Sequence, residues 1–68
     1  MLMPRYPDIQ VSLHSRNPLA MVSAVRTALR TAAIDSREIH RFSAEALAED
    51  EPSRVRDVCA EWTSIRVL

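Results

Sequence analysis

HSRNPLAMVSAVRTALRTAA, residues 14–33, carries the clearest helix pattern in this 68-residue chain. Asn17 and Pro18 predict the start of the helix, because Asn accepts hydrogen bonds from free backbone N–H groups and Pro at the first helical position needs no donor. Apolar residues then recur at spacings of three and four: Leu19, Val22, Val25, Leu29 and Ala32, with Met21 and Ala28 beside them. Polar residues on the opposite side are Ser23, Arg26, Thr27 and Arg30. The pattern predicts an amphipathic helix that ends near Ala33.

Residues 8–14, just before this helix, alternate between polar and apolar side chains. Ile9, Val11 and Leu13 fall on one side, which predicts a half-buried strand. The residues ahead of it contain two prolines and little pattern, so we expect a partly ordered lead-in over residues 1–7.

Two more helices follow. The first of them begins at Asp35 or Ser36, with Glu38 three residues after a capping acid in a capping-box-like start. Its apolar stripe is Ile39, Phe42, Ala46 and Leu47. Pro52 predicts the start of the next helix, whose apolar face is Val55, Val58, Cys59 and Trp62. Residues 63–68 alternate again and predict a short terminal strand.

The order of these elements predicts an α+β fold in a single small domain, residues 1–68. The order of the elements is strand, three helices, strand (β-α-α-α-β), and we expect the helices to pack on one face of a small two-stranded sheet. If the helices alternate in direction, the two strands run parallel. Phe42 and Trp62 stand at the centres of their stripes, so we expect them to pack with Leu29 and Val58 in the core.

Composition excludes several kinds of chemistry. The chain has no net charge, with +3 on residues 1–34 and −3 on residues 35–68, which argues against strong non-specific nucleic-acid binding. It has no glycine, so no phosphate-cradling loop of the Walker or dinucleotide type can be written. A single cysteine forms no intramolecular disulfide, and no apolar run suits a signal peptide or a membrane span. We therefore expect a cytoplasmic protein with no membrane association.

Catalytic and metal-binding residues are not apparent in the sequence. Cys59 lies on an apolar helix face, where a thiol acts as a small hydrophobe. His14 and His40 have no partner at metal-ligand spacing, and no nucleophile elbow marks a Ser-His-acid triad. We expect no enzyme activity, no metal and no cofactor.

Two groups of charged residues are candidates for binding a partner. Arg26 and Arg30, and then Arg37 and Arg41, are spaced i, i+4, so each pair forms a basic spot on one helix face. The acidic group is Glu49, Asp50 and Glu51. The alternative is that these arginines line solvated faces and that the acids favour the dipole of the following helix. Acids at the start of that helix also argue against a helix-turn-helix, because the phosphate backbone of DNA would approach there. If the arginines bind a partner, we expect an acidic protein surface rather than DNA.

Four segments carry a resemblance to a known family: YPDIQV at 6–11, VRTALRTAAI at 25–34, EIHRFSAEAL at 38–47 and VCAEW at 58–62. Together they resemble a family of small uncharacterised proteins from bacteria and from phage or plasmid genomes. Its pattern is YPDI, ALR-x-AG, a helix containing EA, and a Trp followed by a strand. The chain departs from it at Ala33, where the family tends to have Gly, and at the acids of 49–51. The resemblance implies a compact αβ fold and a phage or mobile-element context, with no known activity.

These observations favour a non-enzymatic protein-binding module associated with a phage or mobile element. The phage context that the resemblance implies suggests one concrete version, an inhibitor of a host defence complex of the CRISPR type. The alternative is a small nucleic-acid-binding regulator that uses the arginine-bearing helix faces. Because neither predicted strand holds Lys or an internal Pro to blunt its edge, we also expect a homodimer, or strand addition to a protein partner, through the first or last strand.

Overall fold

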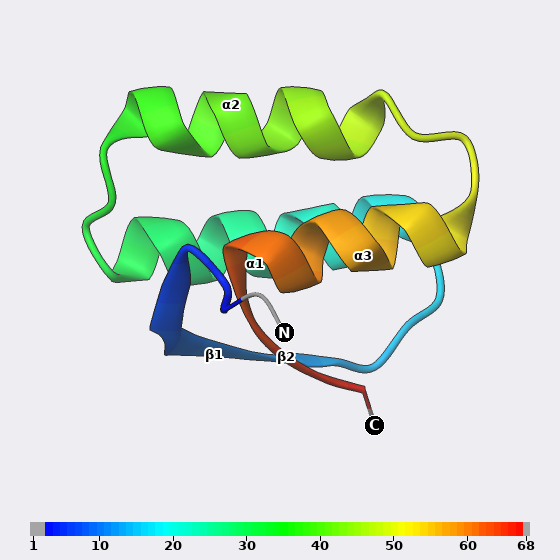
Figure 1. Cartoon of the computed structure of the whole chain (residues 1–68), viewed down its shortest axis with the longest axis horizontal. Helices are drawn as coiled ribbons and strands as arrows, with labels where there is room; N and C mark the ends of the chain where they lie inside the picture. Colours follow the sequence, from blue (N-terminus) through cyan, green and yellow to red (C-terminus); the bar gives the residue numbers. More distant parts are fainter. Residues whose placement is uncertain (1–2, 68) are drawn as a thin grey trace.

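The computed structural model describes residues 3–67 and confirms the α+β order β-α-α-α-β (Figure 1). The elements are β1 (Tyr6–Leu13), α1 (Pro18–Thr31), α2 (Ser36–Leu47), α3 (Pro52–Trp62) and β2 (Thr63–Val67). Residues 1 and 2 of the predicted lead-in and residue 68 of the predicted terminal strand lie outside the described residues. β1 begins two residues before the predicted Asp8, so Tyr6 and Pro7 belong to the sheet.

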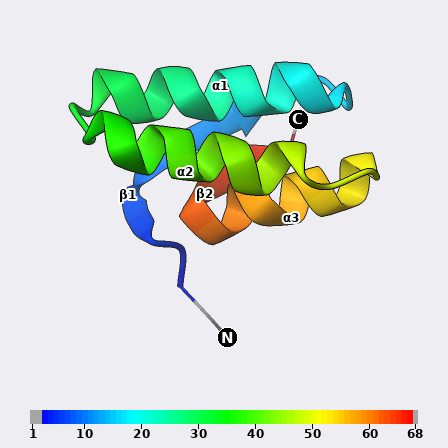
Figure 2. The ribbon, with the colours of Figure 1, turned by 90° about the horizontal axis from the view of Figure 1, so that it is seen from above.

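The elements form three layers. The sheet lies at the bottom of Figure 1, α1 and α3 lie on it, and α2 lies over both helices, as the view from above in Figure 2 also shows. The apolar stripe of α2 therefore enters the space between α1 and α3. Phe42, from the middle of that stripe, is fully buried.

α1 begins and ends where its backbone hydrogen bonds find partners. Asn17 Oδ1 accepts from the backbone N–H of Leu19 at 2.9 Å, as the capping pattern predicts. At the other end Ala33 has φ 60°, and its N–H donates to the carbonyl of Arg30 at 3.0 Å. Ile34 N–H donates to the carbonyl of Leu29 at 3.0 Å, which completes a Schellman motif. The helix therefore ends at Thr31, two residues before the predicted end, because Ala33 is left-handed.

α2 begins at the predicted position but without a capping box. Asp35 Oδ1 accepts from the N–H of Arg37 at 2.8 Å. The sequence pattern suggests that Glu38 accepts a hydrogen bond from the backbone of the cap residue. In the structure Glu38 accepts one from the Tyr6 hydroxyl instead, at 3.0 Å. A tertiary partner on β1 thus replaces the local one.

The two strands pair in parallel, as alternating helix directions predict. Val11 is opposite Ile65 and Leu13 is opposite Val67, with an irregularity between Tyr6 and Gln10. Because paired residues share a face, these four side chains line the side that α1 and α3 cover. The outer face is polar and carries Gln10, Ser12, Ser64 and Arg66.

The core confirms the predicted aromatic packing. The rings of Phe42 and Trp62 meet edge to face, with centroids 5.8 Å apart, and Leu29 and Val58 are buried in the same cluster. Three residues of the predicted apolar stripes lie outside the core: Leu19 is 68% exposed, Leu47 is 57% exposed, and Ala32, the C-cap residue of α1, is exposed as well. Leu19 lies in the first turn of α1 and Leu47 is the last residue of α2, so each projects past the elements that cover the rest of its stripe.

Candidate binding surfaces

The four arginines of the predicted basic spots differ in their surroundings. Arg30, Arg37 and Arg41 are exposed, whereas Arg26 is half-buried. Among the described residues, Arg26 Nε is buried without a hydrogen-bond partner. Arg41 Nε lies 3.3 Å from Glu45 Oε2, in an ion pair one helical turn along α2. Arg30 and Arg37 are therefore the arginines of this set that stand exposed without an ion pair within residues 3–67.

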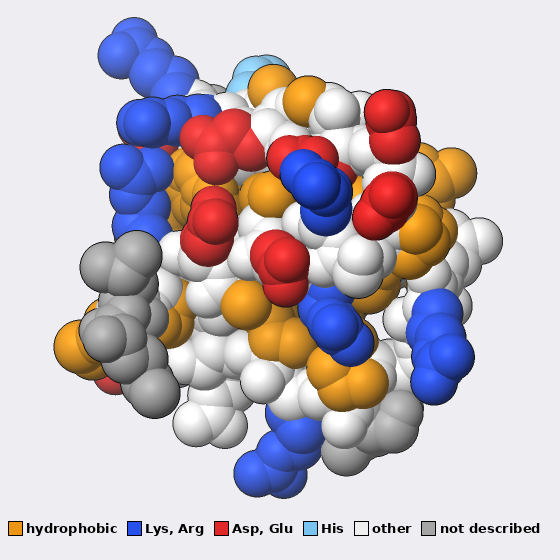
Figure 3. All heavy atoms as spheres, turned by 45° about the vertical axis from the view of Figure 1, so that its right-hand side comes forward, with side chains coloured by type: hydrophobic (Ala, Val, Ile, Leu, Met, Phe, Trp, Pro, Cys, Tyr) orange, Lys and Arg blue, Asp and Glu red, His pale blue; other side chains and the backbone are white. Residues whose placement is uncertain are grey.

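The three predicted acids form the connection between α2 and α3. Asp50 and Glu51 are exposed and Glu49 is half-buried. Glu51 is the N-cap residue of α3, but its side chain makes no capping hydrogen bond and lies 4.0 Å from Arg54 Nε. The face in Figure 3, which turns this connection forward, has acidic and arginine side chains interspersed with apolar atoms. No large area of a single charge covers that face.

A polar cluster around Trp62 was not apparent from the sequence. Trp62 Nε1 donates to Glu45 Oε1 at 3.0 Å, and the same carboxylate pairs with Arg41. The Arg5 guanidinium lies 4.7 Å from the centre of the Trp62 ring, in a cation–π contact. Arg41 of the predicted site thus contributes to the frame that holds the indole.

Glu38 extends this cluster to the start of β1. Its Oε1 accepts from the Tyr6 hydroxyl at 3.0 Å and lies 3.5 Å from an Arg5 terminal nitrogen. Partial burial, and then the hydrogen bond to Glu38 with its negative charge, raise the pKa of Tyr6 above its usual value of 10.0. These bonds join β1, α2 and α3, so the cluster stabilises the packing of three elements.

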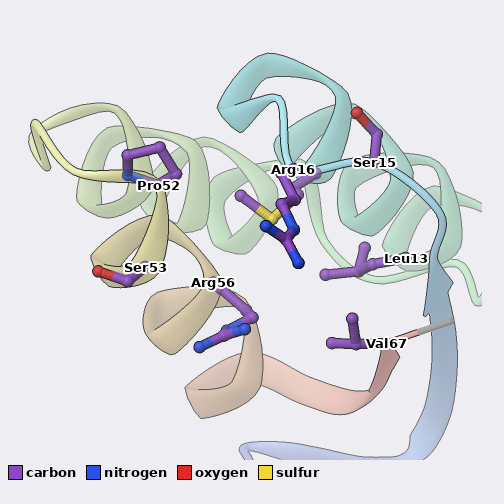
Figure 4. Close-up of a pocket in the computed structure, with 8 residues that line it drawn as sticks. Leu13, Ser15, Arg16, Pro52, Ser53, Arg56 and Val67 are labelled. Carbon is purple, nitrogen blue, oxygen red and sulfur yellow. The ribbon is translucent and has the colours of Figure 1, made fainter.

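A pocket of about 390 Å³ opens at the opposite end of the sheet (Figure 4). Its apolar lining is Leu13, Met21 and Val67, from the ends of both strands and the first turn of α1. Arg16 reaches into it from the loop before α1, and Arg56 faces it from α3. Val67 is 57% exposed although it stands on the apolar side of the sheet, because the pocket leaves its side chain open to solvent.

Sequence reasoning missed this pocket for a clear reason. Arg16 and Arg56 belong to segments far apart in the chain, and only the parallel pairing of β1 with β2 brings the ends of both strands to them. Arg56 lies on α3 among the polar residues beside a regular apolar stripe, so nothing in the neighbouring sequence indicates that it lines a pocket.

The cysteine and the two histidines differ in their exposure. Cys59 is fully buried, as its place on the apolar face predicts, and burial raises the pKa of its thiol to about 11. His14 and His40 are exposed. Within residues 3–67, no group of three or more His, Cys, Asp or Glu side chains is placed to hold a metal ion. None of the helices described is long and apolar enough to cross a membrane.

Comparison of this chain with protein-family models, with curated proteins and with solved structures finds no significant match.

Proposed function

We propose that the chain is a non-enzymatic protein-binding module that takes up a partner strand at an open edge of its sheet. The supporting observation is that β1 and β2 pair with each other in a two-stranded sheet, within the part of the chain described. Each strand therefore keeps one edge of backbone N–H and C=O groups without a strand partner, and such edges are templates for another chain.

The edge of β1 is the better candidate of the two. Pro7 lies inside β1, contrary to the prediction from sequence, and it removes one donor at the start of the strand. From Gln10 to Leu13, however, β1 holds neither a proline nor a charged residue. β2 is shorter and carries the exposed Arg66. Charge on an edge strand opposes pairing, so residues 10–13 offer the least protected edge.

Homodimerisation is the first form of this proposal. We expect light scattering to give a dimer mass at micromolar concentration. Replacing Gln10 and Ser12 together by Lys puts two charges on the exposed face of β1 and should give a monomer. Replacing Ser23 and Thr27 by Lys adds the same charge to the exposed side of α1 and should leave the dimer intact. A monomeric wild type, or two double variants that behave alike, would show that this form is wrong.

Strand addition to a different protein is the second form. In a monomer, the β1 amides that point away from β2 should exchange quickly with solvent, because they have no hydrogen-bond partner in the part of the chain that the structure describes. Hydrogen exchange resolved by residue measures this directly. Slow exchange at those amides in a monomeric sample would mean that the edge is already covered, and both forms would fail.

The resemblance to phage and plasmid proteins supports a finer version, in which the partner is a host defence complex of the CRISPR type and the chain inhibits it. A phage targeted by such a system should regain plaque formation in cells that express the chain. Gln10→Lys/Ser12→Lys should abolish this rescue, and Ser23→Lys/Thr27→Lys should preserve it. Absence of any rescue by the wild type would contradict the version tested.

Regulation through nucleic acid is the competing function. Arg41 is paired with Glu45 and Arg26 is half-buried, so two of the four arginines that this function would use are less available to phosphates than exposed, unpaired arginines. Fluorescence anisotropy with labelled duplex DNA and single-stranded RNA separates the two classes. Affinity that falls steeply between low and physiological salt would favour the regulator, and no binding in low salt would exclude it.

A further inference from the structure

The pocket at the open end of the sheet has the chemistry of an anion site with an apolar floor. Among residues 3–67, its lining carries two guanidinium groups, from Arg16 and Arg56, and no carboxylate. Neither arginine has a carboxylate within 4.0 Å among residues 3–67, whereas Arg5, Arg41 and Arg54 each have one. The two charges are therefore not compensated by a neighbouring acid within that part of the chain.

We infer that this pocket binds the C-terminal residue of a partner polypeptide. The terminal carboxylate faces Arg16 and Arg56, and an aliphatic side chain lies on Leu13, Met21 and Val67. The inference rests on the protein-binding function proposed above, and it adds the chemistry by which the partner is recognised.

A carboxylate fits the charged part of the pocket better than other groups. The guanidinium group is planar and presents its N–H donors in a fork that matches the two oxygens of a carboxylate. Arg16 and Arg56 come from different elements and both line the pocket (Figure 4). The match is one of charge, since the other described residues of the lining have no ionisable side chain.

An aliphatic group fits the remainder. Leu13 and Met21 are buried at the base of the pocket, and Val67 is open to solvent on the same side. A volume of about 390 Å³ is at the lower end of the range for ligand pockets, which suits one side chain with its carboxylate. Covering this floor removes apolar surface from water, which favours binding.

The position of the pocket points to the end of a polypeptide. Leu13 is the last residue of β1 and Val67 the last of β2, and both line the pocket. In a parallel sheet the carboxyl ends of all strands meet at one edge. A partner strand added in parallel would therefore finish at this level, with its terminal carboxylate beside the two arginines.

The probe is the peptide acetyl-Ala-Val-Leu with a free carboxylate, titrated into ¹⁵N-labelled protein and followed by amide chemical shifts. We expect the largest shifts at Ser15, Arg16, Ser53, Arg56 and Val67. The same peptide with a C-terminal amide should bind about tenfold more weakly, because it loses the charge-assisted hydrogen bonds. 4-Methylpentanoate, which has the side chain and the carboxylate but no peptide group, should also bind several-fold more weakly.

Arg16→Gln and Arg56→Gln should each weaken binding of the free peptide by about fivefold or more and reduce its preference over the amide. Arg54→Gln is the matched control, because Arg54 lies on the same helix, is exposed and does not line the pocket. Its affinity should equal that of the wild type. Amide spectra of each variant report whether the fold is retained.

Three results would overturn the inference. Equal affinity for the acid and the amide would show that the arginines do not recognise a carboxylate. Equal or tighter binding of 4-methylpentanoate would identify a small-molecule acid as the ligand, and shifts elsewhere would place the site off the pocket. The proposed strand addition is tested separately, by hydrogen exchange of the β1 amides. Carboxylate-dependent binding together with a covered β1 edge would support the pocket inference and refute only the strand addition.

Discussion

Replacing Ala33 by Gly is expected to stabilise this protein. Ala33 has φ 60°, the left-handed conformation that the Schellman motif at the end of α1 requires. In a residue with a Cβ atom, that conformation costs roughly 1–2 kcal/mol of folding free energy. Gly avoids this cost but loses about 0.5–1 kcal/mol more conformational entropy on folding. The net gain is about 0.5–1 kcal/mol, a sizeable fraction of the roughly 3–5 kcal/mol by which a domain of this size is stable.

Thermal unfolding followed by circular dichroism measures this gain. For a domain of this size, about 1 kcal/mol raises the Tm by roughly 4–8 °C. Ala44→Gly is the matched control, because it makes the same chemical change at an exposed position inside α2. It should lower the stability by about 1 kcal/mol. If Ala33→Gly melts at or below the wild-type temperature, the left-handed conformation at Ala33 does not cost what the argument assigns to it.

Further predictions concern the core, the arginine faces and the buried thiol. Trp62 is 3% exposed and packs edge to face on Phe42, so Trp62→Ala should cost about 3–5 kcal/mol and abolish cooperative unfolding in urea, measured by far-ultraviolet circular dichroism. A transition near the wild-type midpoint would contradict this packing, and Trp62→Phe, which keeps a ring but loses the hydrogen bond to Glu45, should lose only about 1–2 kcal/mol. Replacing Arg26 and Arg30 together by Gln should change the unfolding free energy by less than about 0.5 kcal/mol, since Arg30 is exposed and the buried Arg26 Nε has no partner within residues 3–67 to lose. Failure of that variant to fold would show that these side chains are part of the packing. The buried thiol of Cys59 should make its full contribution to the free energy of unfolding below pH 9 and lose it as the pH rises toward 11. The reason is that the thiol has a pKa near 9.0 in the unfolded chain and about 11 in the folded one. The loss amounts to about 2–3 kcal/mol. Cys59→Ala should remove most of this slope, leaving the smaller loss that the raised pKa of Tyr6 contributes in the same direction, and an equal slope in both proteins would refute the assignment to Cys59.

Local physics was enough to determine the elements of this protein. Asn17 and Asp35 cap α1 and α2 in the structure as their positions in the sequence predict, because a cap needs only backbone N–H groups two or three residues away. The period of the apolar residues determined which side of each helix is buried, and Phe42 and Trp62 meet because each stands at the centre of its stripe. Parallel strand pairing agrees with the sequence-based expectation, which depended on the three helices alternating in direction.

Only the tertiary structure decided which residues of those apolar stripes are exposed to solvent. Leu19 and Leu47 continue their patterns but project past the neighbouring elements, which periodicity cannot express. Glu38 satisfies a local capping pattern and yet bonds Tyr6 on β1, because the packing of α2 beside the start of β1 offers it a phenol hydroxyl.

The same holds for the surfaces proposed to bind a partner. Arg16 and Arg56 line one pocket because parallel pairing puts the ends of β1 and β2 between them, and no spacing along the chain encodes that meeting. The seven candidate residues chosen from charge alone, by contrast, are spread over two helices and a loop. Two of them, Arg41 and Glu51, form ion pairs with residues four and three positions along the chain. A sequence specifies the charge and polarity of a side chain and its near neighbours; which distant groups face it depends on how the layers stack.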